Sequence, residues 1–317
     1  MESSESGEDD SSSRCLDIIF RKAKHSEADD IFKIYNDSIE YLDKESKEWI
    51  ESIIRKRSKR ARIYVAIVDE KVVGFAIVYK KRNNAYIDAL AVDIKYRGKG
   101  IGSCLLSYIE GVLSREGVEK IYLTVKNHNN KALGIYIKNG YKISNVIFIL
   151  EARSSDIDVH TENLDKISIK MDSAKKISFP KVKLLDTALW SNFTWDVDEA
   201  IYRMSKEEAI NITVYNGKRV AGVAQITVED NKITVERLAI SYYKPSESLK
   251  ILINAIKIHM DRNSEVSIII PVDSTKSSLL KTLISIGFRI IDSEYVLHKY
   301  LSIEEHQTSI PLTLQPQ

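Results

Sequence analysis

The sequence has few of the residues that turn or crosslink a chain. It contains Gly 12 and Pro 5 in 317 residues, well below the average usage of about 7% and about 5%. Its two cysteines, Cys15 and Cys104, are too few for a disulfide framework or a cysteine-based metal site. We therefore expect reduced thiols, a cytoplasmic location and no bound metal.

Long hydrophobic runs and a dominant charge are also missing. No stretch approaches the roughly 18 apolar residues of a membrane-spanning helix. Residues 1–15 are acidic and serine-rich, unlike a signal peptide. The 47 Lys and Arg against 45 Asp and Glu leave a net charge of +2, too small for a dedicated nucleic-acid binder. We expect a protein that does not bind membranes and for which nucleic acid is an unlikely partner.

The length indicates two domains, because a typical domain has roughly 150 residues. A hydrophobic fraction of 44% and a charged fraction of 29% are ordinary for globular proteins. Residues 1–15 have too little apolar surface to fold, so we expect a disordered tail there and a flexible tail at 303–317. The polar, non-periodic residues 151–165 are predicted to be a linker.

The second half of the chain repeats motifs of the first at a nearly constant spacing. The matching segments are residues 73–76 with 221–224, 90–92 with 238–240, and 140–141 with 287–288. The first two pairs lie 148 residues apart and the third 147. A spacing held over three separate motifs predicts a duplicated domain, at 16–150 and 166–302.

A glycine-rich loop is predicted at residues 97–102, which read Arg-Gly-Lys-Gly-Ile-Gly between a β-rich run and a helical pattern. Backbone N–H groups at such a helix start can hold a phosphate. The dinucleotide fingerprint is not met, because Ser103 stands where its third glycine belongs. The alternative is a turn whose glycines serve geometry only.

Two motifs together resemble the GNAT superfamily of acetyl-CoA-dependent N-acetyltransferases across residues 18–150. The first, Gln/Arg-x-x-Gly-x-Gly/Ala, is matched by Arg97, Gly100 and Gly102. The second is matched by Val125, Asn129, Ala132, Tyr136, Gly140 and Tyr141. The resemblance implies an α/β (α+β) fold with two tandem GNAT-like domains, each a mixed, mostly antiparallel sheet flanked by helices. It also implies acetyl-CoA as co-substrate and an amine as acceptor.

The resemblance also implies which residues bind the coenzyme. They are Leu90, Ala91, Val92, Arg97, Gly98, Lys99, Gly100, Ile101, Gly102, Ser103, Asn129, Ala132 and Tyr136. The loop from Arg97 to Ser103 would bind the pyrophosphate through backbone N–H groups. Residues 90–92 would pair with the pantetheine arm, which Asn129 would also contact.

Two side chains are candidates for proton transfer. By the same resemblance, the Tyr136 hydroxyl would lie near the sulfur as general acid; alternatively, Tyr136 is a core aromatic on an amphipathic helix. Asp88, the only acid in the apolar strand predicted at 85–92, is the candidate base, and its alternative is a solvated or ion-paired strand residue. Cys104 has no evident base partner, so we expect direct transfer in a ternary complex.

The second repeat lacks this chemistry. Residues 241–248 replace the loop without a glycine, Leu283 stands for Tyr136, and Lys276 for Asn129. We expect a degenerate GNAT-like domain that binds no coenzyme, packs on the first as half of a pseudo-dimer and helps wall the acceptor cleft. A monomer with this internal pseudo-dimer and a homodimer both remain open.

The sequence leaves the acceptor and the acyl length open. Thr124 stands where many peptide N-terminal acetyltransferases carry Glu. The acceptor region would include Tyr35, Asn36, Asp37, Tyr41 and Trp49. The basic run at 55–62 is either a partner surface or a solvated helix end. The rival function is a non-catalytic regulatory module that binds an acyl-CoA.

Overall fold

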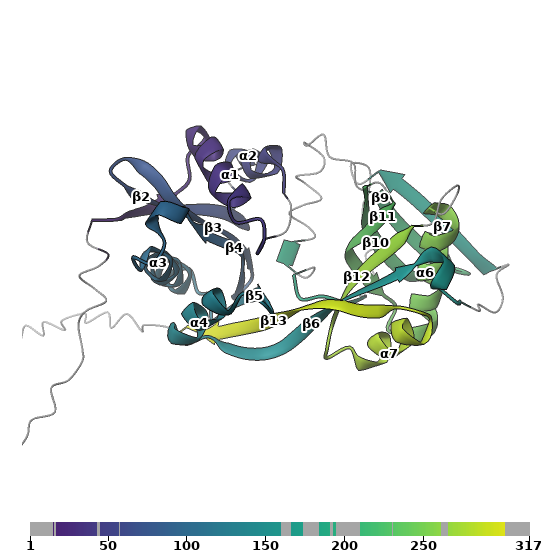
Figure 1. Ribbon diagram of the computed structural model, residues 1–317. Helices are drawn as coiled ribbons and strands as arrows, with labels where there is room; N and C mark the ends of the chain where they lie inside the picture. Colours follow the sequence, from purple (N-terminus) through teal and green to yellow (C-terminus); the bar gives the residue numbers. More distant parts are fainter. Residues whose placement is uncertain are drawn as a thin grey trace, which may run out of the picture.

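Strands from both repeats join one mixed sheet in the computed structural model, and this sheet runs the length of the molecule (Figure 1). It contains thirteen strands among the residues that the structure describes. Those residues are 15, 17–42, 45–56, 58–159, 166–173, 184–190, 193–194, 210–229, 231–260 and 266–301. Residues 1–14 and 302–317, in the two predicted tails, lie outside them, as do residues 160–165 of the predicted linker.

The first repeat follows the predicted order of strands, helices and loop. Its strands are β1 (Ile19–Lys22), β2 (Ala61–Val68), β3 (Lys71–Lys81), β4 (Asn84–Val92), β5 (Lys120–Lys126) and β6 (Lys142–Arg153). Its α-helices are α1 (Ala28–Asn36), α2 (Lys47–Lys56), α3 (Ile101–Arg115) and α4 (Asn130–Lys138). Short 3-10 turns span His25–Glu27, Ile94–Tyr96 and Ser154–Asp156.

Helices cover both faces of this half of the sheet. On one face, Ile31 of α1 and Ile50 of α2 pack with Phe75 of β3 in a buried cluster. On the other face, Leu105 and Ile109 of α3 pack in a second cluster against the strands. Each helix thus buries one apolar stripe, as the helical spacing of these residues predicts.

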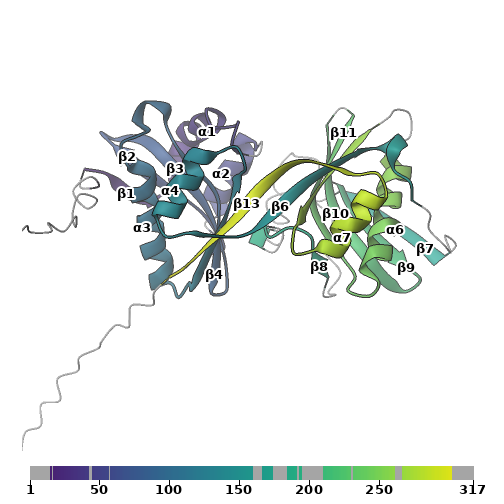
Figure 2. The ribbon, with the colours of Figure 1, turned by 60° about the horizontal axis from the view of Figure 1, so that its bottom comes forward.

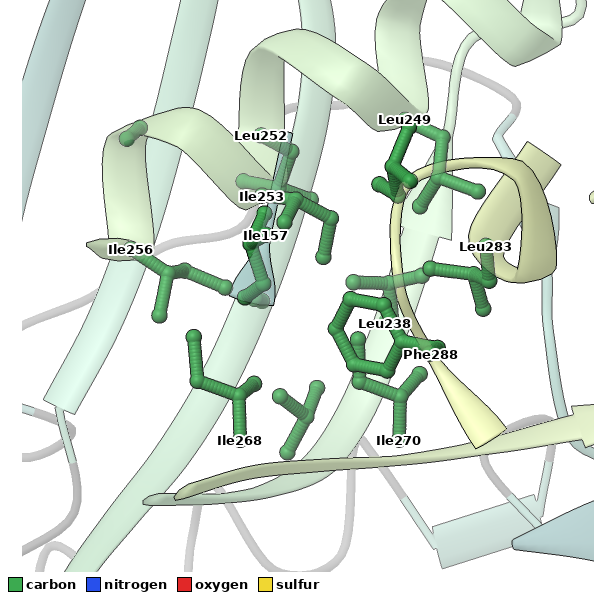
Figure 3. Packing of buried hydrophobic residues seen from close by; sticks show 14 of the residues in the cluster. Ile157, Leu238, Leu249, Leu252, Ile253, Ile256, Ile268, Ile270, Leu283 and Phe288 are labelled. Carbon is green, nitrogen blue, oxygen red and sulfur yellow. The ribbon is translucent and has the colours of Figure 1, made fainter. Parts of the chain in front are cut away.

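From β9 (Ile210–Asn216) onward, the second repeat has the same succession of elements as the first repeat has from β2 onward. Its strands are β7 (Ile167–Ser173), β8 (Leu185–Asp186), β9, β10 (Arg219–Glu229), β11 (Lys232–Ile240), β12 (Ser267–Asp273) and β13 (Arg289–Tyr300). Its helices are α6 (Pro245–Met260) and α7 (Ser277–Ser285). Figure 3 shows its core, in which Leu249 and Leu252 of α6, Leu283 of α7 and Phe288 pack against strand residues such as Ile268.

The two repeats exchange their last strands. The order across the sheet is β1-β2-β3-β4-β5-β13-β6-β12-β11-β10-β9-β7, with β8 paired to β11. β13 of the second repeat therefore lies between β5 and β6, and β6 of the first repeat pairs with β12. Figure 2 shows β6 and β13 running side by side between the two halves.

Each exchanged strand also buries side chains in the core of the other repeat. Leu297 of β13 is 0% exposed and belongs to the cluster beneath α3. Leu150 and Ala152 of β6 belong to the cluster beneath α6. Because each strand supplies apolar surface as well as backbone hydrogen bonds, neither half of the sheet is complete without the other.

This exchange changes the predicted domain boundaries. β6 continues to Arg153, so residues 151–153 belong to a strand and not to the linker expected at 151–165. The strand beside β5 comes from the second repeat, and not from residues 141–150. The two domains predicted at 16–150 and 166–302 thus share a sheet through their closing strands.

Cys15 and Cys104 form a disulfide, so the expectation of reduced thiols was wrong. Their Cα atoms lie 5.9 Å apart, although 89 residues separate them in the sequence. The bond ties the segment before β1 to the first turn of α3. Only the packing of the folded chain brings the pair together, and the argument from cysteine usage for a reducing location loses its basis.

Two further expectations concern what the chain does not contain. Within the described ranges, no helix is both long and apolar enough to cross a membrane. The same residues contain no group of three or more His, Cys, Asp or Glu side chains placed to hold a metal ion.

Candidate active site

Asp88 occupies a bulge in β4, where the sheet begins to open. The pairing of β3 with β4 shifts by one residue here, since Ile77 lies opposite Ala89 and Val78 opposite Ile87. A bulge of this kind leaves one residue outside the regular pairing and re-aims its side chain. Asp88 is half-buried and lines a large cavity.

β4 and β5 separate beyond this bulge. The two strands pair in parallel only as far as Ile87 and Leu123. Residues 90–92 remain paired with β3 but have no partner on β5. Backbone groups on that side of β4 can therefore pair with an extended ligand.

Two glycines shape the loop between β4 and α3. Gly98 has a φ of 81° and Gly100 a φ of 83°, values that residues with a side chain adopt only with strain. A Cβ atom at either position would meet no atom within 4 Å, so the loop faces open space. Glycine is needed here for its backbone conformation.

The loop also presents backbone donors at the start of α3. Within the described chain, the first N–H after Arg97 that donates to another backbone group is that of Cys104, to the Gly100 carbonyl at 3.0 Å. The N–H groups of residues 98–103 therefore lie at the positive end of the helix dipole without a backbone acceptor. Such an arrangement suits an anionic ligand.

Arg97 holds the loop through its side chain. Its Nε donates to the Val92 carbonyl at 2.8 Å, and its Nη2 donates to the Ser38 hydroxyl at 2.9 Å. The Arg97 N–H donates to the Ile94 carbonyl at 3.4 Å. Lys99 turns toward Tyr96, with Nζ 5.0 Å from the ring centroid. Arg97 thus anchors the loop to β4 and to the end of α1.

Asn129 caps the start of α4. Its Oδ1 accepts a hydrogen bond from the Ala132 N–H at 3.1 Å. Both residues line the cavity, together with Lys131. Because Oδ1 already accepts the capping hydrogen bond, Asn129 would contact a ligand through its Nδ2.

Tyr136 is a core residue that also reaches the cavity. It is 8% exposed and packs in the cluster beneath α3, with its ring edge-on to Tyr141 at 5.7 Å between centroids. It also lines the cavity. Burial raises the pKa of the Tyr136 phenol well above its usual range, so the hydroxyl stays protonated and can donate a hydrogen bond.

One cavity of about 1650 Å³ brings the predicted residues together. All of the predicted coenzyme-binding residues except Lys99 line it, and so does Asp88. Of the predicted acceptor residues, Tyr35, Tyr41 and Trp49 line the cavity, whereas Asn36 and Asp37 are exposed and do not. Ligand pockets are commonly about 300–1,000 Å³, so this cavity has room for more than one small ligand.

The second repeat forms the far wall of this cavity. Lining residues from it include Thr227, Glu229, Glu236, Arg237, Asp292 and Glu294. None of these six residues was predicted from the sequence. For Glu236 a signal existed: it lies 148 residues after Asp88 and occupies the matching bulge of β11, where the pairing with β10 shifts.

Aromatic residues join the two repeats beside Thr124. The Tyr86 hydroxyl lies 3.1 Å from the Thr124 hydroxyl, and Phe193 of the second repeat stacks on the Tyr86 ring at 5.7 Å. Trp190 donates from Nε1 to the Glu236 carbonyl at 3.4 Å. These contacts close the cavity over the junction of the two halves.

The basic run at 55–62 lies away from the cavity. Arg62 donates to the Tyr64 hydroxyl at 3.1 Å and pairs with Glu116, while Arg55 pairs with Glu51 at 3.6 Å. None of its described members lines the cavity, and residue 57 lies outside the described chain.

The start of α6 differs from that of α3. The Ser248 N–H donates to the Lys244 carbonyl at 2.9 Å, as the Cys104 N–H does to the Gly100 carbonyl, but Lys244 forms an ion pair with Glu247 at 2.9 Å. A carboxylate in the first turn repels an anion. Leu283, at the place of Tyr136, is fully buried.

Comparisons with known proteins agree with this geometry. The model of the Acetyltransferase (GNAT) family matches residues 28–141. A peptidyl-lysine N-acetyltransferase from Salmonella typhimurium is 26% identical over 132 residues, which cover 40% of this chain and 85% of that protein. A spermidine N(1)-acetyltransferase from Thermoplasma acidophilum is 27% identical over 126 residues, which cover 34% of this chain and 78% of that protein.

A solved structure extends the likeness in fold to both repeats. A tandem GNAT protein from the clavulanic acid biosynthesis pathway superposes with a TM-score of 0.59 at 13% identity. The alignment covers 90% of this chain and 99% of that one. At this identity the likeness concerns the fold alone.

Proposed function

We propose that the chain is an acyltransferase that transfers an acetyl group from acetyl-CoA to a primary amine in a ternary complex, because the model of the acetyltransferase (GNAT) family matches its residues 28–141. The observation that carries this proposal is the single cavity that joins the glycine loop, the open edge of β4, Asp88 and Tyr136. A cavity of that size supports simultaneous binding of both substrates.

The residues present fit the coenzyme. The N–H groups of residues 98–103 would hold the pyrophosphate, and positive φ angles at Gly98 and Gly100 leave the approach open. Residues 90–92 would pair with the pantetheine arm along the edge that β5 leaves free. When bound, acetyl-CoA supplies an activated acyl group as a thioester.

Proton handling falls to Asp88 and Tyr136. The acceptor nitrogen must lose a proton before its lone pair attacks the thioester carbonyl carbon, and Asp88 would accept that proton through water. As the carbon–sulfur bond breaks, the departing sulfur becomes a thiolate. The raised pKa of Tyr136 makes full proton transfer to a thiolate of pKa about 8.5 unfavourable, so Tyr136 would act mainly as a hydrogen-bond donor to the sulfur.

Direct transfer is supported by the state of Cys104. A covalent route through this residue would need a free thiol near the thioester, but the Cys104 sulfur is bonded to Cys15. The acetyl group would therefore pass directly to the amine.

The acceptor class follows from the relatives and from the site. The two relatives act, by their names, on peptidyl-lysine and on spermidine, which both present a primary amine on an alkyl chain. Thr124, not a carboxylate, stands beside Val125 in this cavity. Both features support a primary alkylamine over a peptide N-terminus.

The second repeat would serve the acceptor side without binding coenzyme. The ion pair at the start of α6 and the buried Leu283 support the loss of coenzyme binding there. Its residues in the cavity wall support a role in shaping the acceptor site.

Coenzyme A release from acetyl-CoA tests this function. The acceptors would be polyamines, aminoglycosides, free amino acids, lysine peptides and peptides with free N-termini, with Tyr136→Phe and Asp88→Asn run beside the native chain. We expect turnover with alkylamines and a reduction of about 10²-fold or more in Asp88→Asn. Tight acetyl-CoA binding without release for any acceptor would instead identify a non-catalytic acyl-CoA-binding regulatory module.

A further inference from the structure

We propose that Glu294, which the second repeat carries on β13 into the sheet of the first, binds a second positive charge of the acceptor. The enzyme would thereby select diamines and polyamines over monoamines. This inference rests on the proposed acetyltransferase function and names its substrate class.

The sheet register places Glu294 in the acceptor part of the cavity. β13 pairs with β5 so that Val296 lies opposite Thr124 and Glu294 opposite Lys126. Directly opposed residues in antiparallel strands share a face, so Glu294 lies on the same face as Thr124. Glu294 lines the cavity and is only 9% exposed.

The distance between Glu294 and Asp88 suits an acceptor molecule that carries two nitrogen atoms. β13 lies two positions from β4 in the sheet. Two regular strand spacings correspond to about 10 Å, and the separation of β4 from β5 beyond Ile87 increases this distance. With its reacting nitrogen near Asp88, an extended diamine of moderate length would bring its other nitrogen toward Glu294.

The charge of the cavity favours a cationic ligand at this end. Arg97 and Lys131 lie beside the coenzyme loop and the start of α4. The rest of the lining carries seven carboxylates, from Glu45, Glu48, Asp88, Glu229, Glu236, Asp292 and Glu294. It carries four basic groups, from Lys47, Lys126, Lys232 and Arg237. The acceptor end therefore has an excess of negative charge.

Two of these four basic groups are engaged elsewhere. Lys47 forms ion pairs with Asp29 and Glu51, which lie outside the lining. Buried Arg237 donates from its guanidinium to Gln225 and Thr194. An ammonium group is the ligand that this excess of negative charge favours.

Burying the carboxylate of Glu294 costs free energy unless the carboxylate takes part in a stabilising interaction. A carboxylate taken out of water loses free energy unless cations or donors compensate for its lost hydration. Lys126 lies directly opposite and supplies positive charge to the same part of the cavity. An acceptor ammonium would add a charge-assisted hydrogen bond at Glu294 in a site shielded from water.

The experiment compares primary monoamines with diamines of matched chain length, in the full-length native chain and in Glu294→Gln. The native chain should show a kcat/KM at least about tenfold higher for diamines, the value of one charge-assisted hydrogen bond. Glu294→Gln should remove that preference by raising the KM for diamines, while kcat/KM for monoamines and the KM for acetyl-CoA stay unchanged. Retained monoamine turnover shows that the variant is folded.

Glu151→Gln provides the matched control, because Glu151 lies on the other exchanged strand and does not line the cavity. It should keep the diamine preference. Equal activity of the native chain toward both amine series, or an equal loss for both series in Glu294→Gln, would overturn the inference while leaving the acetyltransferase function in place.

Calorimetric titration of a diamine into the chain with coenzyme A separates the two proposals. If no acceptor is turned over but the diamine binds the native chain and not Glu294→Gln, the acetyltransferase function fails and the cation site stands. If the diamine binds both chains alike, the cation site fails.

Discussion

Lys299 of β13 donates to Glu110 of α3 at 2.7 Å, which joins the last strand of the second repeat to a helix of the first. The side chains are 26% and 13% exposed. The second carboxylate oxygen of Glu110, Oε1, is buried. This ion pair fastens the exchanged strand at its far end.

Removing Lys299 should cost more stability than neutralising both partners. Lys299→Met leaves the largely buried Glu110 carboxylate without its cation, and we expect a loss of about 2 kcal/mol in the free energy of unfolding. The double variant with Glu110→Gln should recover part of that loss. Chemical denaturation of the native chain, the two single variants and the double variant measures the four free energies of unfolding. If the losses of the two single variants simply add in the double variant, Lys299 and Glu110 are not coupled.

Neither repeat should fold without the other, because each lacks one strand of its own sheet. A chain that ends at residue 159 loses β13, and with it the hydrogen bonds of β5 and the buried Leu297. We expect this fragment to aggregate or to lack cooperative unfolding in circular dichroism.

Coexpression of the fragments 1–159 and 160–317 supplies the control. Both exchanged strands are then present, so a folded heterodimer should form. Cooperative unfolding of the 1–159 fragment alone would contradict the strand exchange.

Gly100→Ala should weaken acetyl-CoA binding as well as stability. Gly100 and Gly117 have similar φ angles of 83° and 75°, and a Cβ at either would meet no atom within 4 Å. Each substitution should therefore cost about 1 kcal/mol of stability through backbone strain.

Only Gly100→Ala should raise the KM for acetyl-CoA, because Gly117 follows the other end of α3. Steady-state kinetics with acetyl-CoA as the varied substrate separates the two effects. Equal KM values in both variants would remove the phosphate-binding role of the loop.

Alkaline pH should destabilise the protein through its buried tyrosines. Burial raises the pKa of Tyr136 and of Tyr141 in the folded state, whereas the unfolded chain has the ordinary value of about 10. Above that value the unfolded state binds fewer protons than the folded state, so the free energy of unfolding falls as pH rises.

Tyr136→Phe should make this decline less steep, and Tyr136→Phe with Tyr141→Phe should reduce it further. Thermal unfolding from pH 8 to pH 11 measures the slope. An unchanged slope in the double variant would show that neither phenol titrates abnormally.

Reduction of the disulfide should lower the melting temperature. Cys15 and Cys104 close a segment of 89 residues, and a crosslink of that length typically contributes about 2–5 kcal/mol by restricting the unfolded chain. Melting curves with and without dithiothreitol test this. The variant Cys15→Ser is the control, and its melting should not respond to the reductant.

Local sequence sufficed for the coenzyme side of the site. The glycines of residues 98–102 and the cap at Asn129 depend on their immediate neighbours, since φ angles, helix starts and caps are set within a few residues. That is why the loop and the helix after it could be predicted.

Pairings distant in the sequence could not be predicted in the same way. β6 and β13 are both 12 residues long and occupy matching places in the two repeats, so the sequence cannot decide which of them pairs with β5. The place of Glu294 in the cavity depends on which strand pairs with β5. The Cys15–Cys104 bond depends on packing between residues far apart in the sequence. The acceptor wall was therefore missed although the coenzyme site was found.

The exchanged strands also set the order in which the protein can be made. The loop and β4 leave the ribosome early, but β5 receives its neighbour only when residues 289–300 have been synthesised. Those residues are near the end of the chain, well over 150 positions after β5. At roughly 5–20 residues per second, the interval is on the order of ten seconds or longer. The nascent first repeat must stay unfinished for that time, so the cavity can close only after β13 has been synthesised.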